Sequence, residues 1–242
     1  MGILDNIVYV PCHVKNHGAE RKASDIKYLV YHYTGNDGDN DTNNAKYYQN
    51  TVVQASAHYF VDDDSITRSV DDLTIAWAVG GKKWSDCPQT GGGKLYGVCT
   101  NANSISIEMC DTKRDGTLMA TDKTLENAIA LGKVLMKKYN IPLDRVVRHF
   151  DVTGKHCPTY FMDEQKWAAF KARLVEVDKP AEPKTEKRYQ TLAEIEKGAP
   201  WAAPTIRRLC VSGALNGTGT GLDLSYDMLR IFVVLDRTGA FE

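Results

Sequence analysis

The sequence predicts an α/β protein with a central mixed β-sheet flanked by helices, followed by a small all-α C-terminal module. Short apolar runs rich in β-branched and aromatic residues alternate with segments whose apolar residues recur at helical spacing, which is typical of layered α/β domains. A charged stretch with two prolines then interrupts this pattern, and two more helical segments follow it. The chain of 242 residues is long enough for one full domain and a smaller one.

The expected strands of the sheet are four apolar runs. They are 27-KYLVYHYT-34, 56-SAHYFV-61, 104-SISIEMC-110 and 146-VVRHF-150. Residues 80–97 contain the sequences GGKKW and TGGGKLYG, and so much glycine disfavours both helix and strand. This stretch is expected to be a long loop, and long loops in compact domains are often functional.

The expected helices of the first domain begin at residues that can cap them. Thr42 and Asn43 can cap the first helix, and Thr121 or Asp122 can open a longer amphipathic one. The three helices are expected at residues 42–54, 121–139 and 163–175.

The domain boundary is predicted at residues 176–188, EVDKPAEPKTEKR, because this segment is charged, contains two prolines and has almost no apolar residues. Residues 1–175 would form the larger domain and residues 189–242 the module. In the module, Pro200 and Trp201 begin one helix and Ser225 caps a second.

Such a helical hairpin of about 50 residues buries only a small core by itself. It is therefore expected to pack on the larger domain or on a second copy of the chain. The residues expected at a contact between two copies are Trp201, Ile206, Leu209, Leu229 and Phe232.

Charge and hydropathy exclude several functional classes. Lys and Arg total 30 against 31 Asp and Glu, so the basic surface of a nucleic-acid-binding protein is not expected. No apolar run approaches the ~20 residues that span a bilayer, and the first residues lack the basic region of a secretory signal. We expect a cytoplasmic chain without membrane insertion. Its six cysteines are then expected to be free thiols or metal ligands. The alternative is a disulfide between Cys87 and Cys99 that forms after the protein leaves the cell.

Three residues form a candidate metal centre. His32 and His149 each lie where an apolar run ends, and Cys157 follows His149 after the turn DVTGKH. Two imidazoles and one thiolate suit zinc and leave a fourth position open for water. The alternative for each histidine is a hydrogen-bonded structural role, and that role is the one expected for His58 inside the second run.

Two further residues are candidates for acid–base and electrostatic roles. Glu108 lies in a run that is expected to be buried on both faces, and a buried carboxylate suits a general base. Its alternative is a salt bridge in the core, for example with Arg148. Lys155 lies on the turn before Cys157, where it can face an oxyanion or remain an exposed loop lysine.

The sequences YLVYHYTG, SAHYFVDDD, TIAWAVGG, SISIEMC and RHFDVTGKHCP, in this order, resemble the type 2 N-acetylmuramoyl-L-alanine amidases. That family shares its fold with peptidoglycan recognition proteins and phage endolysins. The similarity covers about residues 24–175, and RHFDVTGKHCP is its most specific part. The resemblance implies zinc-dependent hydrolysis of the amide between N-acetylmuramic acid and L-alanine in peptidoglycan. It implies His32, His149 and Cys157 as zinc ligands and Glu108 and Lys155 as catalytic groups.

The sequence departs from this pattern after the tryptophan of the AW motif, where many relatives have histidine and this chain has Ala78. Trp77 is nevertheless expected to line the substrate groove. Trp84 is a candidate for stacking on a sugar face, with an ordinary packing role as its alternative. The segment after residue 200 resembles endolysin cell-wall-binding modules and, more distantly, the S-layer homology repeat. The resemblance implies an endolysin that a membrane pore releases to the bacterial cell wall, where the module tethers it and raises its effective concentration.

Two other functions are compatible with the sequence. One is a non-catalytic peptidoglycan recognition protein, which has the fold without a complete metal site. The other is a thiol hydrolase with Cys157 as nucleophile and His149 as base. Pro158 directly follows Cys157 and no helix is expected to begin there, so nothing lowers the pKa of this thiol and the second alternative is disfavoured.

Overall fold

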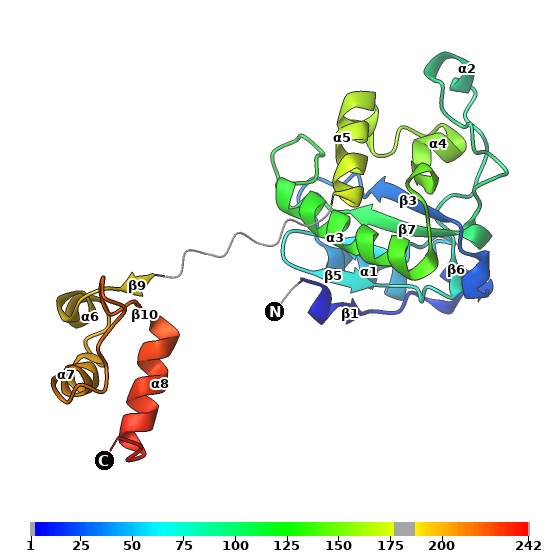
Figure 1. Ribbon diagram of the computed structural model, residues 1–242. Coiled ribbons are helices and arrows are strands. Elements are labelled where there is room, and N and C mark those ends of the chain that lie inside the picture. Colours follow the sequence, from blue (N-terminus) through cyan, green and yellow to red (C-terminus); the bar gives the residue numbers. More distant parts are fainter. Residues whose placement is uncertain (1–2, 177–186, 242) are drawn as a thin grey trace. The chain divides into compact units, whose positions relative to one another are not determined.

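The structure is a computed structural model that describes residues 3–176 and 187–241. The chain divides into two compact units, Met1–Glu176 and Val177–Glu242 (Figure 1). Most of the expected linker, residues 177–186, lies outside the described residues. Arg188, the last residue of that expected linker, already belongs to a strand of the second unit.

A six-stranded mixed sheet is the centre of the first unit, in the order β1-β5-β4-β7-β3-β8. The pairs β4–β7, β7–β3, β3–β8 and β1–β5 are parallel, whereas β4 and β5 are antiparallel. A separate antiparallel pair joins β2 to β6. The strand bounds are β1 Val8–Tyr9, β2 His17–Glu20, β3 Tyr28–Tyr33, β4 Tyr59–Val61, β5 Ile66–Arg68, β6 Thr74–Ala76, β7 Ser104–Met109 and β8 Val146–Arg148.

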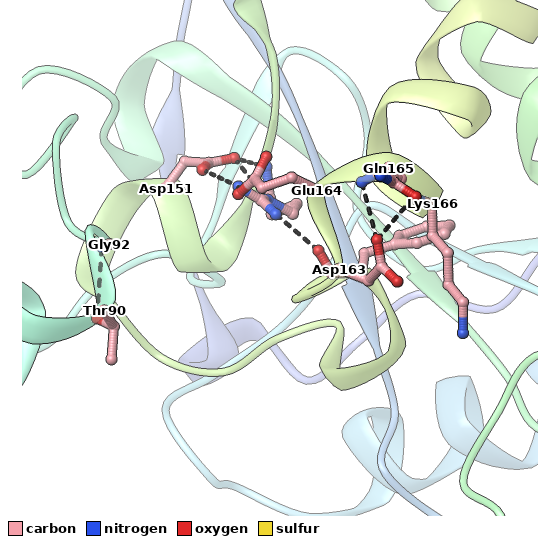
Figure 2. Close-up of polar contacts among 9 residues, drawn as sticks. Thr90, Gly92, Asp151, Asp163, Glu164, Gln165 and Lys166 are labelled. Atoms are coloured by element: carbon pink, nitrogen blue, oxygen red, sulfur yellow. Dashed lines mark hydrogen bonds and ion pairs between the residues drawn. The ribbon is translucent and has the colours of Figure 1, made fainter.

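The helices of the first unit begin mostly where capping residues predict them. The bounds are α1 Asp41–Asn50, α2 Cys87–Thr90, α3 Asp122–Tyr139, α4 His149–Thr153 and α5 Glu164–Val175. Thr121 caps α3 by accepting a hydrogen bond from the Thr124 N–H. Asp163 caps α5 by accepting from the N–H groups of Gln165 and Lys166, as Figure 2 shows. The first helix is capped by Asn40 and not by Thr42 or Asn43, and it ends at Asn50, earlier than expected. The long loop contains one helical turn, α2, which the sequence did not predict.

The two faces of the sheet have different covers, because successive side chains of a strand point to opposite faces. Tyr31 of β3 lies on the face that α3 and α5 cover: its ring packs on Phe170, and its hydroxyl donates to the Ala128 carbonyl oxygen at 3.1 Å. Val30 and Phe60 lie on the other face, where Phe60 packs with Ala45 of α1. His32 follows this second pattern, so the candidate metal centre lies on the face opposite the main core.

A buried carboxylate, Asp72, ties the sheet to the end of α3. It accepts hydrogen bonds from the Tyr59 hydroxyl at 2.6 Å, the Tyr139 hydroxyl at 2.7 Å and the Lys138 ammonium at 2.8 Å. Burial alone would raise the pKa of Asp72, but these hydrogen bonds lower it below its ordinary value. The charged form is therefore the one that the fold stabilises.

We expect the substitution Asp72→Asn to lower the free energy of unfolding at pH 7 by about 2 kcal/mol, because it weakens three hydrogen bonds to a charged group. Because the folded pKa is lowered, this stabilisation is present above the unfolded pKa of about 3.9 and is lost as pH falls through the folded value. Urea unfolding at pH 7 and pH 3 measures the effect, with the exposed Asp144→Asn as control. An equal deficit at both pH values would contradict this explanation.

The second unit is more than the expected hairpin. It contains helices α6 Leu192–Gly198, α7 Ala203–Val211 and α8 Tyr226–Arg237, and an antiparallel pair of β9 Arg188–Tyr189 with β10 Leu224–Ser225. Helix α6 and the strand pair, which the sequence did not predict, close an apolar core of their own with α7 and α8. None of the described helices combines the length and apolar character that crossing a bilayer requires.

The predicted contact between two copies is wrong for most of its residues. Ile206, Leu209 and Leu229 are 0%, 3% and 0% exposed, because they form the core of the second unit itself. Trp201 remains 39% exposed, with its ring against Tyr226. Phe232 is partly buried against the same core.

Candidate metal centre and adjoining groove

The structure brings His32, His149 and Cys157 together. One potential ligand atom from each lies within 4.8 Å of the others, and all three side chains are buried. His32 Nδ1 lies 3.9 Å from Cys157 Sγ, and the two imidazole rings are 4.7 Å apart between centroids. Among the described residues, this is the one cluster of three or more His, Cys, Asp or Glu side chains that could bind a metal ion together.

The donor set and its spacing fit zinc. A tetrahedral site with Zn–N of about 2.0–2.1 Å and Zn–S of about 2.3 Å places nitrogen and sulfur about 3.6 Å apart, close to the 3.9 Å between His32 Nδ1 and Cys157 Sγ. Burial, followed by the nearby Lys155 charge, lowers the pKa of His149 to about 4. The pKa of His32 is also lowered, chiefly by burial. Both rings are therefore neutral at pH 7, as metal ligation requires.

His149 reaches this position by a different local structure than expected. The run 146–150 is a strand only as far as Arg148, and His149 is the first residue of helix α4. Asp151 accepts from the Arg148 N–H at 2.8 Å and also binds its guanidinium at 2.7 Å. Glu164 at the start of α5 binds the same guanidinium at 2.8 Å, and the two carboxylates lie together in Figure 2. This cluster fixes the turn that aims His149 at His32.

The glycine-rich loop is tied to α4 along its length. The N–H groups of Trp84, Gly93 and Leu95 donate to the carbonyl oxygens of Thr153, Phe150 and Asp151 respectively, at 2.8–2.9 Å. The loop therefore supports the helix that carries His149. Cys87 and Cys99 are both free and buried in this structure, so the alternative of a disulfide between them is not realised here.

Glu108 faces the metal centre from the neighbouring strand. It is the register partner of His32 in the β3–β7 ladder, and its Oε1 lies 3.8 Å from His32 Nδ1. Burial raises the pKa of Glu108 to about 8, the Lys155 charge opposes this shift, and Asp39 adds to it. Its Oε2 is buried and has no hydrogen-bond partner among the described residues. The alternative of a core salt bridge to Arg148 is wrong, because Arg148 binds Asp151 and Glu164.

A groove of about 660 Å³ opens beside Glu108. Glu108 and Lys155 both line it, and the Lys155 side chain is exposed, so its proposed role at the oxyanion stays a prediction. The other residues that line it are Tyr33, Thr34, Asn36, Asp37, Gly38, Asp39, Asn43, Asn44, Tyr47, Tyr48, Phe60 and Arg114.

The sequence missed most of this lining. Two Asp- and Gly-rich segments, 36-NDGDND-41 and 111-DTKRDG-116, form part of it, but they are far apart along the chain and neither alone indicates the other. Asp39 joins them: its N–H donates to the Asp111 carbonyl oxygen at 2.7 Å, and its Oδ1 accepts from the Asp111 N–H at 2.9 Å.

The two tryptophans expected at the groove lie in different places. Trp84 is 47% exposed and stacks on His156 beside Lys155, with ring centroids 6.1 Å apart. Trp77 follows β6, and neither tryptophan is among the described residues that line the groove. The Trp77 indole lies against Gly18 of β2, where any side chain would meet Nε1 at 3.1 Å. A substrate contact stays a prediction for both residues, and Trp77 in addition packs against Gly18.

His58 has the structural role that the sequence predicts. It is fully buried, its Nδ1 accepts from the Ser106 N–H at 3.1 Å, and its Nε2 lies 3.1 Å from the Thr74 carbonyl oxygen. Burial, followed by the Arg21 charge, lowers the pKa of His58 to about 3. The neutral ring therefore acts as a hydrogen-bonded core residue.

The environment of Cys157 disfavours a thiol nucleophile. Its side chain is 1% exposed, and burial, together with the Glu108 charge, raises the pKa of the thiol to about 12. No described helix begins at Cys157. A reactive cysteine needs a lowered pKa and access to substrate, and this thiol has neither.

Similar proteins have names that match these observations. N-acetylmuramoyl-L-alanine amidase BlyA of Bacillus subtilis (strain 168) is 29% identical over 208 residues, 83% of this chain and 53% of the relative. A probable N-acetylmuramoyl-L-alanine amidase of Bacillus licheniformis is 32% identical over 158 residues, 63% of this chain and 42% of the relative. The chain thus spans about half of the length of these relatives.

Solved structures are similar as well. The catalytic domain of XlyA is 30% identical with a TM-score of 0.54, covering 70% of this chain and 99% of that domain. The structure of PlyL is 27% identical with a TM-score of 0.56, covering 70% of this chain and 96% of that one. These likenesses confirm the predicted fold of the first unit.

The family model described as N-acetylmuramoyl-L-alanine amidase matches residues 22–160. The predicted resemblance, over about residues 24–175, is confirmed by this match as far as residue 160. The match includes all three members of the His-His-Cys group, Glu108 and Lys155. Because it spans more than half of the 242 residues, the chain belongs to the N-acetylmuramoyl-L-alanine amidase family.

Proposed function

We propose that this chain hydrolyses the amide bond between N-acetylmuramic acid and L-alanine in peptidoglycan, with zinc bound by His32, His149 and Cys157. The observation that carries the proposal is the juxtaposition of this His-His-Cys group with Glu108 on the adjacent strand. A zinc ion held there would supply an activated water and polarise the scissile carbonyl. Three protein ligands leave a coordination position for that chemistry.

The chain's own residues divide the remaining work. Glu108 accepts the proton of the attacking water at a carboxylate oxygen and donates it to the leaving amine, since its Oε2 is committed to no partner among the described residues. Lys155 lies on the rim of the same groove, where its ammonium stabilises the negative charge that develops on the carbonyl oxygen. The protein positions these two groups from β7 and from the segment before Cys157.

We further propose that the chain acts as an endolysin of phage type, reaching the cell wall after release from the cytoplasm, with the second unit as its wall-binding module. The structural similarity to a mutant endolysin from Bacillus subtilis, 31% identical with a TM-score of 0.54, supports the endolysin role. The closed core of the second unit supports a separate binding module. A tethered binder raises the local concentration of the enzyme at an insoluble substrate.

Metal removal tests the proposal. Purified full-length protein is incubated with cell walls, and turbidity and new free amino termini are measured before chelation, after chelation and after zinc return. We expect chelation to abolish the release of amino termini and zinc to restore it. Activity that survives chelation but is lost to a thiol reagent would support a Cys157 nucleophile. Wall binding without any released termini would support a non-catalytic recognition protein.

A further inference from the structure

The groove beside Glu108 contains a cation that the proposed chemistry does not use. Arg114 and Lys155 both line the groove. Arg114 is exposed, and among the described residues no hydrogen bond or ion pair engages its guanidinium. A free guanidinium at the wall of a substrate groove is a binding group for an anion, because it offers several donors in a planar fork.

The backbone on both sides of Arg114 is held in place. Asp37 accepts hydrogen bonds from the N–H groups of Asp115 and Gly116, at 3.0 and 3.1 Å, through one carboxylate oxygen. On the other side, Asp111 is paired with Asp39. The loop that carries Arg114 is therefore attached to the rim of the groove at two points.

Gly38 brings the Arg114 side chain onto the groove wall. Its φ of +75° favours glycine, and a side chain at this position would meet Arg114 Cβ at 2.9 Å and Nε at 3.0 Å. The arginine stem therefore packs closely over the backbone at residue 38. This contact limits the conformations of the stem and lowers the entropy lost when the guanidinium binds a ligand.

Two acidic groups of the groove, Asp37 and Asp39, already accept hydrogen bonds from the protein. Asp39 accepts from Asn36, Asn44 and the Asp111 N–H, and Asp37 accepts from two backbone N–H groups. These carboxylates thus serve as acceptors that shape the two loops. The guanidinium of Arg114 stays available to an anion from outside the protein.

We propose that Arg114 is a specificity residue that binds a carboxylate of the stem peptide, on the leaving-group side of the scissile amide. This inference rests on the proposed amidase function. In a muramoyl amide the carboxyl group of the sugar is consumed in the scissile bond, so the free carboxylates near that bond belong to the peptide. A carboxylate accepts two parallel hydrogen bonds from one guanidinium.

The test uses full-length zinc-loaded protein and synthetic muramoyl peptides in which each carboxylate is replaced in turn by its carboxamide. For the wild type, we expect kcat/KM to fall about tenfold when the recognised carboxylate is amidated, since one charge-assisted pair is lost. Arg114→Gln is expected to show the same loss on the carboxylate peptide and no further loss on its amide. Lys113→Gln, a cation of the same exposed loop that does not line the groove, is the matched control and keeps the wild-type preference.

Two results would overturn the inference while the proposed function stands. One is a wild-type enzyme that cleaves every amidated peptide as well as its parent. The other is an Arg114→Gln variant whose kcat/KM falls equally on all peptides, which indicates a structural effect. If the wild type cleaves neither these peptides nor intact walls, the proposed function fails and the inference fails with it. Thermal unfolding of Arg114→Gln is expected to match the wild type, because the side chain is exposed.

Discussion

His32→Ala is expected to lower kcat/KM for amide hydrolysis by more than about 10³-fold, because the metal loses one of three protein ligands and with it the activated water. His32 also separates the proposed mechanism from the thiol alternative, which needs only His149 and Cys157. Elemental analysis of the purified variant is expected to show less than the one zinc per chain expected of the wild type. The released amino termini measure the activity.

The control for this substitution is His156→Ala. His156 is the neighbour of Cys157 in sequence, but its side chain is 46% exposed and lies 3.6 Å from the Asp86 carboxylate, outside the metal group. We expect this variant to keep its zinc. Because His32 is buried in a strand, circular dichroism must show that its variant is folded, and His32→Cys, which restores a ligand, is expected to recover metal binding. A folded His32→Ala protein with full activity would refute the metal centre.

The substitution Glu108→Gln is expected to lower kcat by about 10²–10⁴-fold, the usual contribution of general acid–base catalysis. The amide keeps the size of the side chain, and Glu108 makes no hydrogen bond that the fold needs, since its Oε2 is buried without a partner among the described residues. Zinc content and the unfolding midpoint are therefore expected to stay near the wild-type values, so the loss falls on kcat. Steady-state kinetics on a soluble muramoyl peptide measures it.

Glu126→Gln is the matched control, because Glu126 lies on the exposed side of α3 and pairs with Lys123 at 3.3 Å, away from the metal group. Its activity is expected to equal that of the wild type. If Glu108→Gln keeps its kcat while its KM rises, Glu108 binds substrate and another group moves the proton. That result would refute the acid–base role of Glu108 without contradicting the proposed zinc site.

The sequence predicted the centre of the sheet because its strands are long and apolar on both faces. The runs around His32 and Glu108 became β3 and β7 nearly in full. The run 146–150 was overestimated, because its last two residues fit a strand by type while Asp151 turns the chain into α4 through Arg148. The pairing of Arg148 with Asp151, three residues apart, was the overlooked signal.

The metal group was predictable because its residues belong to specific motifs, whereas the groove was not. Its walls depend on hydrogen bonds between loops that are more than 70 residues apart, such as Asp111 N–H to Asp39, and no local pattern encodes such a pairing. Helix α6 was missed although Thr191 caps it by accepting from the Glu194 N–H at 3.3 Å, and Glu194 accepts from the Gln190 N–H at 2.6 Å. Helix α6 has few apolar residues, so no helical hydrophobic pattern indicated it in the sequence.

The reciprocal hydrogen bonds between Asp39 and Asp111 have a practical consequence for protein engineering. Segments 36–41 and 111–117 each satisfy backbone groups of the other, through Asp37 as well as Asp39. A chimera that imports only one of them from another enzyme would leave polar backbone groups without their acceptors. An exchange of these loops to change substrate preference therefore requires both segments to be taken together from the same donor enzyme.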